Sequence, residues 1–240
     1  VIKKGWKYSP IFDFKDTYVR KIFKLMLPRT LGLAIMQVNQ VVITIVASNL
    51  VAGSIAVFYF GMNLQSAIVS VFGVSIAIAV FPVLSEHADN KEKFINYLIH
   101  KIKKIIFLVI PISILMIILR AQIVRIVLGT GSFDWWDTYY TAQVLGYFSI
   151  SLVFQCLIPL IARAFYALED TKTPVITSIF SFLLNIFLAI YLSVSMGIEG
   201  IAIAFSASSA LNLILLSLVL YIKFPQMKKY KLTVFIVKVI

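Results

Sequence analysis

The segment SIAVFYFGMNLQSAIVSVFGVSIAIAVFPVL, residues 54–84, carries no charged side chain over its whole length. A helix needs about 20 predominantly apolar residues to cross a bilayer, and only a helix satisfies its own backbone hydrogen bonds there. This segment can therefore span a membrane with some tilt. Five further runs of the same kind flank it. The six expected spans are Ile22 to Ser48, Ser54 to Leu84, Ile105 to Leu128, Tyr139 to Leu168, Val175 to Met196 and Gly200 to Ile222.

Basic side chains orient these spans. Of the 22 Lys and Arg residues, all but Arg120 and Arg125 lie in or beside segments on one side of a membrane crossed six times. Lys and Arg are retained on the cytoplasmic face during insertion, so the asymmetry predicts a cytoplasmic amino-terminal end. We therefore predict an all-α, multi-pass transmembrane helix bundle in the cytoplasmic membrane.

The sequence also suggests how the chain is divided. Residues 1–21 form a basic cytoplasmic lead-in, residues 22–224 form the six-helix lobe, and residues 225–240 form a loop and the start of another membrane helix. The chain begins without an initiator Met and ends inside a new apolar stretch. We expect it to be part of a longer protein.

The composition excludes several classes of protein. Hydrophobic residues make up 61% of the chain and charged residues 13%, which is too apolar for a soluble domain of this length. The net charge of +12 comes from cations that flank apolar runs, where anionic lipid headgroups account for them. Membrane lipids are therefore expected partners, and nucleic acid is not. The single Cys156 has no second cysteine with which to form a disulfide or a Cys-only metal site.

The ionisable residues give no sign of catalysis. All ten acids fall in loops or at span ends, so no carboxylate is available at mid-membrane depth for a proton relay or a cation-coupling site. His87 and His100 belong to no metal or nucleophile motif. A membrane-embedded transferase is the alternative, but the acids that it would need, Glu86, Asp89 and Glu92, have the pattern of a solvated connection. We predict no enzyme activity, cofactor or metal site.

Two spans carry polar stripes at helical spacing. Such stripes either form interhelical hydrogen bonds, worth about 0.6 kcal/mol each, or line a water-filled cavity for a polar or anionic headgroup. The residues alone favour neither the hydrogen bonds between helices nor the water-filled cavity. Two further candidates lie in later spans. The candidate cavity-lining residues are Arg29, Gln37, Gln40, Thr44, Tyr59, Asn63, Ser66, Ser70, Arg163 and Asn185.

Aromatic side chains gather around the longest outer loop, residues 129–137. Amphipathic rings favour the membrane interface, so an interfacial belt is a better interpretation of this cluster than recognition of a sugar. The cluster consists of Phe133, Trp135, Trp136, Tyr139 and Tyr140.

Several short stretches, in register over nearly the whole chain, carry a family resemblance. They are LPRTLG at 27–32, QVN at 37–39 and ASNL at 47–50 with Gly53-Ser54; Gly73-Val74 with FPVLS at 81–85; GSF at 131–133 with Asp137-Thr138 and Thr141-Ala142; and RAFYA at 163–167 with DTKTP at 170–174. In pattern and spacing they resemble the MurJ (MviN) family of lipid II flippases.

The resemblance implies a fourteen-helix protein of the superfamily that also holds the MATE exporters and polysaccharide flippases. Two six-helix lobes would surround a central cavity, and this chain would supply spans seven to twelve and the start of span thirteen. The implied substrate is lipid II, the undecaprenyl-pyrophosphate-linked peptidoglycan precursor, moved between leaflets by alternating access. The implied partner is the N-terminal lobe. The alternative is a related exporter of polysaccharide lipid intermediates or drugs.

One position departs from the family pattern. Many members carry an acidic residue followed by Arg in the middle of the second span, and that Arg is thought to engage the substrate pyrophosphate. Here those positions hold Met62 and Asn63. An amide can hydrogen-bond a phosphate but supplies no charge, so we hypothesise that Arg29, on the polar face of the first span, compensates.

Overall fold

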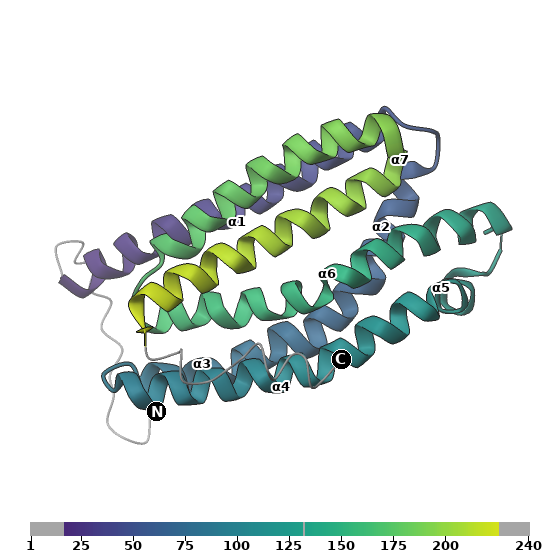
Figure 1. Cartoon of the computed structure of the whole chain (residues 1–240). Coiled ribbons are helices and arrows are strands. Elements are labelled where there is room, and N and C mark those ends of the chain that lie inside the picture. The colour runs from purple at the N-terminus through teal and green to yellow at the C-terminus, as the bar shows by residue number, and fades with distance from the viewer. Residues whose placement is uncertain (1–16, 132, 226–240) are drawn as a thin grey trace, which may run out of the picture.

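A computed structural model of the chain describes residues 17–131 and 133–225, and all the regular structure in these residues is helical (Figure 1). The predicted all-α fold class is confirmed. Residues 1–16 and 226–240, which contain most of the expected lead-in and the expected next helix, lie outside the described residues. The helices are α1 (Thr17–Ser48), α2 (Ser54–Ile68), the π-helical segment η2 (Val69–Val74), α3 (Ser75–Glu86), α4 (Lys91–Ile118), α5 (Arg120–Leu128), α6 (Trp135–Ala167) and α7 (Lys172–Lys223).

Helix α7 contains the last two expected spans. At Gly197 the backbone has φ 58° and ψ −135°, in a region that glycine enters without steric cost, and the chain folds back on itself there (Figure 1). The two arms of α7 are therefore antiparallel neighbours. They approach closely, because a Cβ on Gly200 would lie 2.4 Å from the carbonyl oxygen of Leu192.

Length and apolar composition mark three helical segments of the described chain as membrane spans, Ser54–Glu86, Trp135–Ala167 and Lys172–Lys223, or four if α4 and α5 count as one. The 52-residue α7 is long enough for two crossings. Among the described residues of α1, Gln37–Ser48 forms a shorter apolar stretch. These helices are those of a multi-pass membrane protein.

The expected third span, Ile105 to Leu128, is not one continuous helix. The helix breaks at Leu119, and α5 leaves α4 at an angle of 80°. The bend brings both arginines of α5 against α6 or the loop before it. Arg125 donates to the carbonyl oxygen of Phe133 and to the hydroxyl of Thr138 at 3.3 and 3.4 Å, and Arg120 packs against Gly146.

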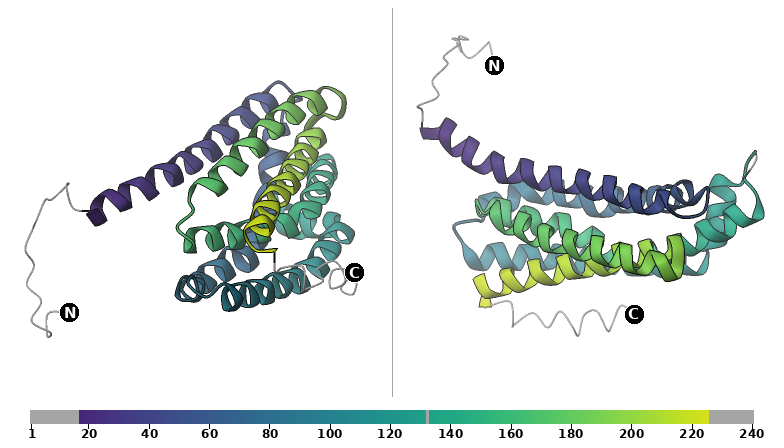
Figure 2. Two further views of the ribbon diagram at one scale, coloured as in Figure 1. Left: turned by 60° about the vertical axis from the view of Figure 1, so that its left-hand side comes forward. Right: turned by 90° about the horizontal axis from the view of Figure 1, so that it is seen from above.

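The bundle has two recognisable ends. We call one of them the lysine end, because the lysines of α4 lie there together with Lys172 and Lys223. Helix α4 begins at this end, and α7 both begins and ends there. The other end, which we call the turn end, holds the α1–α2 turn, the start of α6 and the reversal at Gly197 (Figure 1). The first turns of α1 extend away from the other helices at the lysine end (Figure 2).

Helix α6 is central and contacts α2, η2, α3, α4, α5 and α7. One apolar cluster joins α6 to α3, α4 and the end of α7, with Phe94 and Phe165 fully buried. A second cluster joins α6 to α1, α2 and α7 around Phe58 and Phe148. Glycines bring α2 and η2 against α6, because a Cβ on Gly73 would lie 2.8 Å from the Cα of Cys156.

The turn between α6 and α7 is tied to the far end of α7. The Asp170 carboxylate accepts hydrogen bonds from the backbone amide and hydroxyl of Thr173 at 3.0 and 2.7 Å and pairs with Lys223. The Lys223 ammonium also lies 5.3 Å from the centre of the Phe165 ring. Burial raises the pKa of Asp170, but the hydrogen bonds from Lys223 and Thr173 and the charge of Lys223 outweigh it and hold this pKa below its usual value.

We expect Asp170→Asn to lower the stability of the full-length protein by about 1 kcal/mol, because the Lys223 side chain is partly exposed and its pairing is screened by solvent. Folding lowers the pKa of this carboxyl, so its ionised form stabilises the folded protein fully at pH values above the unfolded pKa of about 3.9. This stabilisation is lost as the pH falls through the pKa of the folded state. Thermal unfolding of both proteins in detergent should therefore differ at pH 7 and converge in acid. A difference that is the same at every pH would contradict this.

Candidate functional site

Polar side chains on α1 and on the α2–η2 span remain exposed in this bundle. We call this surface the polar face; its exposed members are Gln37 and Gln40 of α1 and Asn63, Ser66 and Ser70 of α2 and η2. The two helices meet where the Thr44 hydroxyl and the Tyr59 hydroxyl are hydrogen-bonded at 2.8 Å. From the turn end, α1 and the α2–η2–α3 span then move apart toward the lysine end (Figure 1).

The opposite side of α2 explains why this face stays exposed. Val57, Phe58, Gly61 and Gln65 recur at helical spacing and are buried against the bundle. The buried Gln65 amide donates to the Ser151 hydroxyl of α6 at 2.8 Å, so this polar group is satisfied internally. With its apolar side packed on α6, α2 must turn its remaining polar side chains outward.

The π-helical segment η2 lies in the middle of this span. The Ser75 hydroxyl donates to the carbonyl oxygen of Ser70, five residues earlier, at 2.9 Å. Such segments inside α-helices are frequent at functional sites. Here the segment combines an exposed Ser70 with a buried Gly73 pressed against α6.

The described side chains of the polar face are uncharged. They offer amide and hydroxyl groups, which bind sugar hydroxyls, peptide groups and phosphate oxygens but do not neutralise charge. Arg29 lies in α1, but its side chain is outside the described residues. Arg163 is half-buried near the end of α6, and its side chain is already engaged in an interaction.

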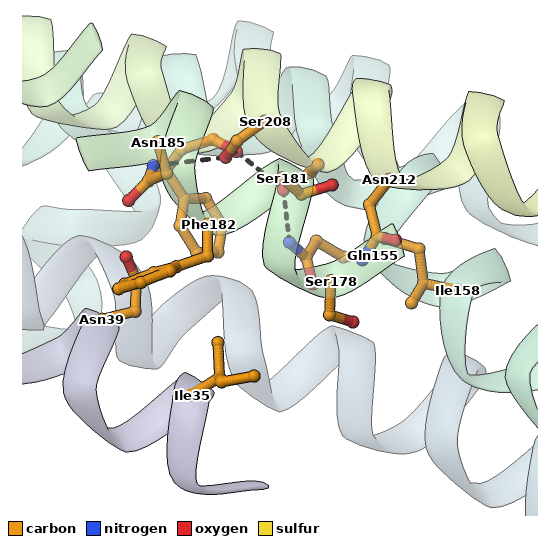
Figure 3. A pocket seen from close by; sticks show the side chains of 12 residues that line it. Ile35, Asn39, Gln155, Ile158, Ser178, Ser181, Phe182, Asn185, Ser208 and Asn212 are labelled. Atoms are coloured by element: carbon orange, nitrogen blue, oxygen red, sulfur yellow. Dashed lines mark hydrogen bonds between the residues drawn. The ribbon is translucent and has the colours of Figure 1, made fainter. Parts of the chain in front are cut away.

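A separate, half-open polar pocket of about 210 Å³, which we call the interior pocket, lies between α1, α6 and both arms of α7 (Figure 3). Within it the Asn185 amide donates to the Ser208 hydroxyl at 3.2 Å, and the Gln155 amide donates to the Ser209 hydroxyl at 2.5 Å. Its lining residues are Ile35, Asn39, Gln155, Ile158, Ser178, Ser181, Phe182, Asn185, Phe205, Ser208, Ser209 and Asn212.

The pocket leaves hydrogen-bond acceptors without donors. The side-chain carbonyl oxygens of Asn39, Asn185 and Asn212 are buried and have no partner among the described residues. Buried acceptors of this kind need a donor or a cation, and a polar cavity of this size has room for ordered water. The lining includes no carboxylate, and the described residues contain no group of three His, Cys, Asp or Glu that could hold a metal. Water is the occupant that this neutral lining suits best.

The structure separates the predicted site residues into groups. Thr44 and Tyr59 pair directly, and their neighbours on the polar face are exposed beside them. Asn185 belongs instead to the interior pocket.

Sequence reasoning missed most of the interior pocket. Asn39 lies between Gln37 and Gln40 in the chain but faces α7. Gln155 and Ser208 lie within the expected spans and were not among the predicted site residues. The spacing of Ser208 and Asn212, one helical turn apart, is the signal that could have indicated a polar face on the last span.

Comparisons with known proteins agree with this architecture. The family model described as "Lipid II flippase MurJ" matches residues 1–240. Among curated relatives, a "Probable lipid II flippase MurJ" of Vibrio cholerae is 32% identical over 218 residues, covering 90% of this chain and 42% of the relative. One of the same description from Haemophilus influenzae is 30% identical over 220 residues, covering 88% and 43%. The chain thus spans about two fifths of these relatives.

Solved structures give the same result. A structure described as "Lipid II flippase MurJ, inward closed conformation" matches with a TM-score of 0.76 and 27% identity, over 98% of this chain and 51% of that one. An outward-facing multidrug resistance MATE transporter of the MOP superfamily matches with a TM-score of 0.75 over 85% of this chain and 45% of that chain. Its identity of 15% makes this a likeness of fold alone.

Proposed function

Because this chain belongs to the lipid II flippase MurJ family, we propose that it forms one six-helix lobe of a flippase that moves lipid II from the cytoplasmic to the outer leaflet. It matches about half of the solved flippase, so another part of the full-length protein would supply the facing lobe. We place the lysine end in the cytoplasm, because Lys and Arg are retained on that side.

The exposed polar face is the observation that carries this proposal. In contact with lipid tails its amides and hydroxyls would lack hydrogen-bond partners, at a cost of several kcal/mol for each group. The wall of a water-filled cavity gives the same groups water, sugar and peptide partners. Because α1 and the α2–η2–α3 span diverge toward the lysine end (Figure 1), we propose that the cavity is wider at that end.

Transport of this kind needs no covalent chemistry. A charged headgroup crosses because a polar cavity replaces its hydration, and the two lobes expose the cavity to one side at a time. The described polar face binds sugar and peptide groups but leaves the pyrophosphate charge unbalanced. We assign the balancing positive charge to Arg29, which the helical spacing of the sequence puts on the polar stripe of the first span.

Complementation of a flippase-depleted bacterial strain by the full-length gene tests this function. We expect Arg29→Ala to reduce rescue by about tenfold or more, the effect of losing about 1.4 kcal/mol of binding. Asn63→Arg introduced into the Arg29→Ala background should restore it by returning a cation to the cavity. Arg20→Ala, an exposed arginine earlier in α1, is the matched control and should rescue fully.

Two outcomes would contradict the proposal in different ways. Full rescue by Arg29→Ala would remove Arg29 from the anion site. Failure of the unmodified gene to rescue, despite correct membrane insertion, would indicate a related exporter with another substrate.

A further inference from the structure

A second hollow, of about 570 Å³, opens at the turn end, away from the lysines. Three segments that are distant in the chain form it: the α1–α2 turn, the first turns of α6 and the reversal of α7 at Gly197. We call it the outer pocket. Its size lies within the usual range for small-molecule sites, about 300–1,000 Å³. The polar and aromatic residues that line it are Asn49, Ser54, Trp136, Asp137, Tyr140, Ser193 and Glu199.

Local hydrogen bonds and the conformation of one glycine fix the backbone around the outer pocket. Asp134 and Asp137 form a reciprocal capping box, in which the Asp137 amide donates to the Asp134 carboxylate at 2.8 Å and the Asp134 amide donates to the Asp137 carboxylate at 3.2 Å. The box sets the first turn of α6 and so places Trp136 and Tyr140 one turn apart. Their rings are stacked with centres 6.4 Å apart. Gly197 holds the opposite wall with φ 58°.

The aromatic rings of this pocket differ from those of a simple interfacial belt. Trp135 is 70% exposed and does not line the pocket, as expected of a ring in the membrane interface. Trp136, although 64% exposed, lines it together with Tyr140 and two carboxylates. A surface that met only lipid would not combine aromatic faces with the acids Asp137 and Glu199, because burying carboxylates against hydrocarbon is costly.

The chemistry of the lining selects the ligand. Aromatic faces pack against the C–H faces of a sugar ring, while carboxylate and amide oxygens accept hydrogen bonds from its hydroxyl and N–H groups. The Glu199 side chain makes no hydrogen bond or ion pair with another described residue, so it is available as an acceptor. No Lys or Arg lines the pocket, and two carboxylates repel a phosphate. The lining therefore fits an uncharged sugar and rejects a phosphate.

We propose that the outer pocket binds a neutral amino-sugar ring of the lipid-linked headgroup after the headgroup reaches the outer side. The inference rests on the proposed flippase function. The two surfaces act in sequence: Arg29 lies about 20 residues, roughly 30 Å of helix, before Asn49 of the outer pocket, so the pyrophosphate leaves that cation before the sugar is received at the turn end. A sugar held there is withdrawn from the cavity, which favours release outward over return.

Binding of a soluble probe to the full-length protein in lipid nanodiscs tests this inference. The probe is N,N′-diacetylchitobiose, a neutral N-acetylglucosamine disaccharide without lipid or phosphate, and saturation-transfer NMR detects its weak binding. We expect Trp136→Ala and Glu199→Gln each to reduce the signal by about tenfold, and Trp135→Ala to leave it unchanged. Arg20→Ala, the exposed arginine control of the complementation experiment, should also leave it unchanged.

The outcomes separate this inference from the flippase function. Equal signals from the unmodified protein and from Trp136→Ala, or no signal at all, would overturn the outer pocket as a sugar site even if complementation succeeds. Displacement of the probe by spermidine but not by free N-acetylglucosamine would overturn it as well, because the pocket would then be an acidic cation site. Binding lost in Trp136→Ala and Glu199→Gln, and displaced by N-acetylglucosamine, would support it.

Discussion

Gly73→Val is expected to remove most of the folded protein from the membrane. Gly73 is buried in η2, where a Cβ would lie 2.8 Å from the Cα and 3.2 Å from the carbonyl oxygen of Cys156. Both contacts are backbone atoms of α6, so no side-chain rotation relieves them. Valine adds three carbons at this position, and the only response is to separate the α2–η2–α3 span from the helix that forms the centre of the bundle.

Overpacking of a filled core usually costs about 1–3 kcal/mol, and the displacement of a helix backbone puts this substitution at or above the upper end of that range. We expect a fall in the unfolding temperature on the order of 10 °C, together with loss of the monodisperse peak in size-exclusion chromatography of the full-length protein. Ala67→Val is the matched control, since Ala67 is exposed on the preceding turns of the same span. An unfolding temperature of Gly73→Val equal to that of the control would refute the close packing of η2 on α6.

Much of this fold follows from the distribution of apolar and basic residues. The charge-free run at 54–84 predicts the span that the structure forms from Ser54 to Glu86. The gap between the expected spans 175–196 and 200–222 contains Gly197, where α7 reverses. The bend at Leu119 was not predicted, because counting apolar residues does not reveal where an arginine will find partners. Arg125 finds them in Thr138 of α6 and in the loop before α6, and the bend also brings Arg120 against Gly146 of α6.

The candidate site was only partly predictable, for a related reason. Helical spacing places Thr44 and Tyr59 on polar stripes, and the structure pairs them. Spacing does not say which polar side chains face the interior: Gln65 turns inward to Ser151, whereas Asn63, two residues earlier, stays exposed. The burial of each side chain depends on which residues of the neighbouring helix lie opposite it, and this is decided by the tertiary structure.

The second large effect is expected from Ser70→Trp, which we predict will abolish transport while the protein still folds. Ser70 is exposed on the polar face, so its side chain has room to grow without displacing the core. If the polar face lines the cavity, an indole there occupies the volume needed by a bulky headgroup and replaces a hydroxyl with an apolar ring. In the complementation experiment the colony count, which reports transport, should fall by at least about a hundredfold. A hundredfold loss corresponds to about 2.8 kcal/mol of free energy.

The control for this effect must be equally exposed but face lipid. Leu183 of α7 is 55% exposed and lies among the exposed apolar side chains Phe180, Phe187 and Ile190, which recur at helical spacing. Leu183→Trp should therefore insert normally and rescue the depleted strain. Membrane abundance of both variants, measured by immunoblot, separates a blocked cavity from misfolding. Full rescue by Ser70→Trp at normal abundance would place the polar face outside the transport path and would refute the assignment on which the proposed function rests.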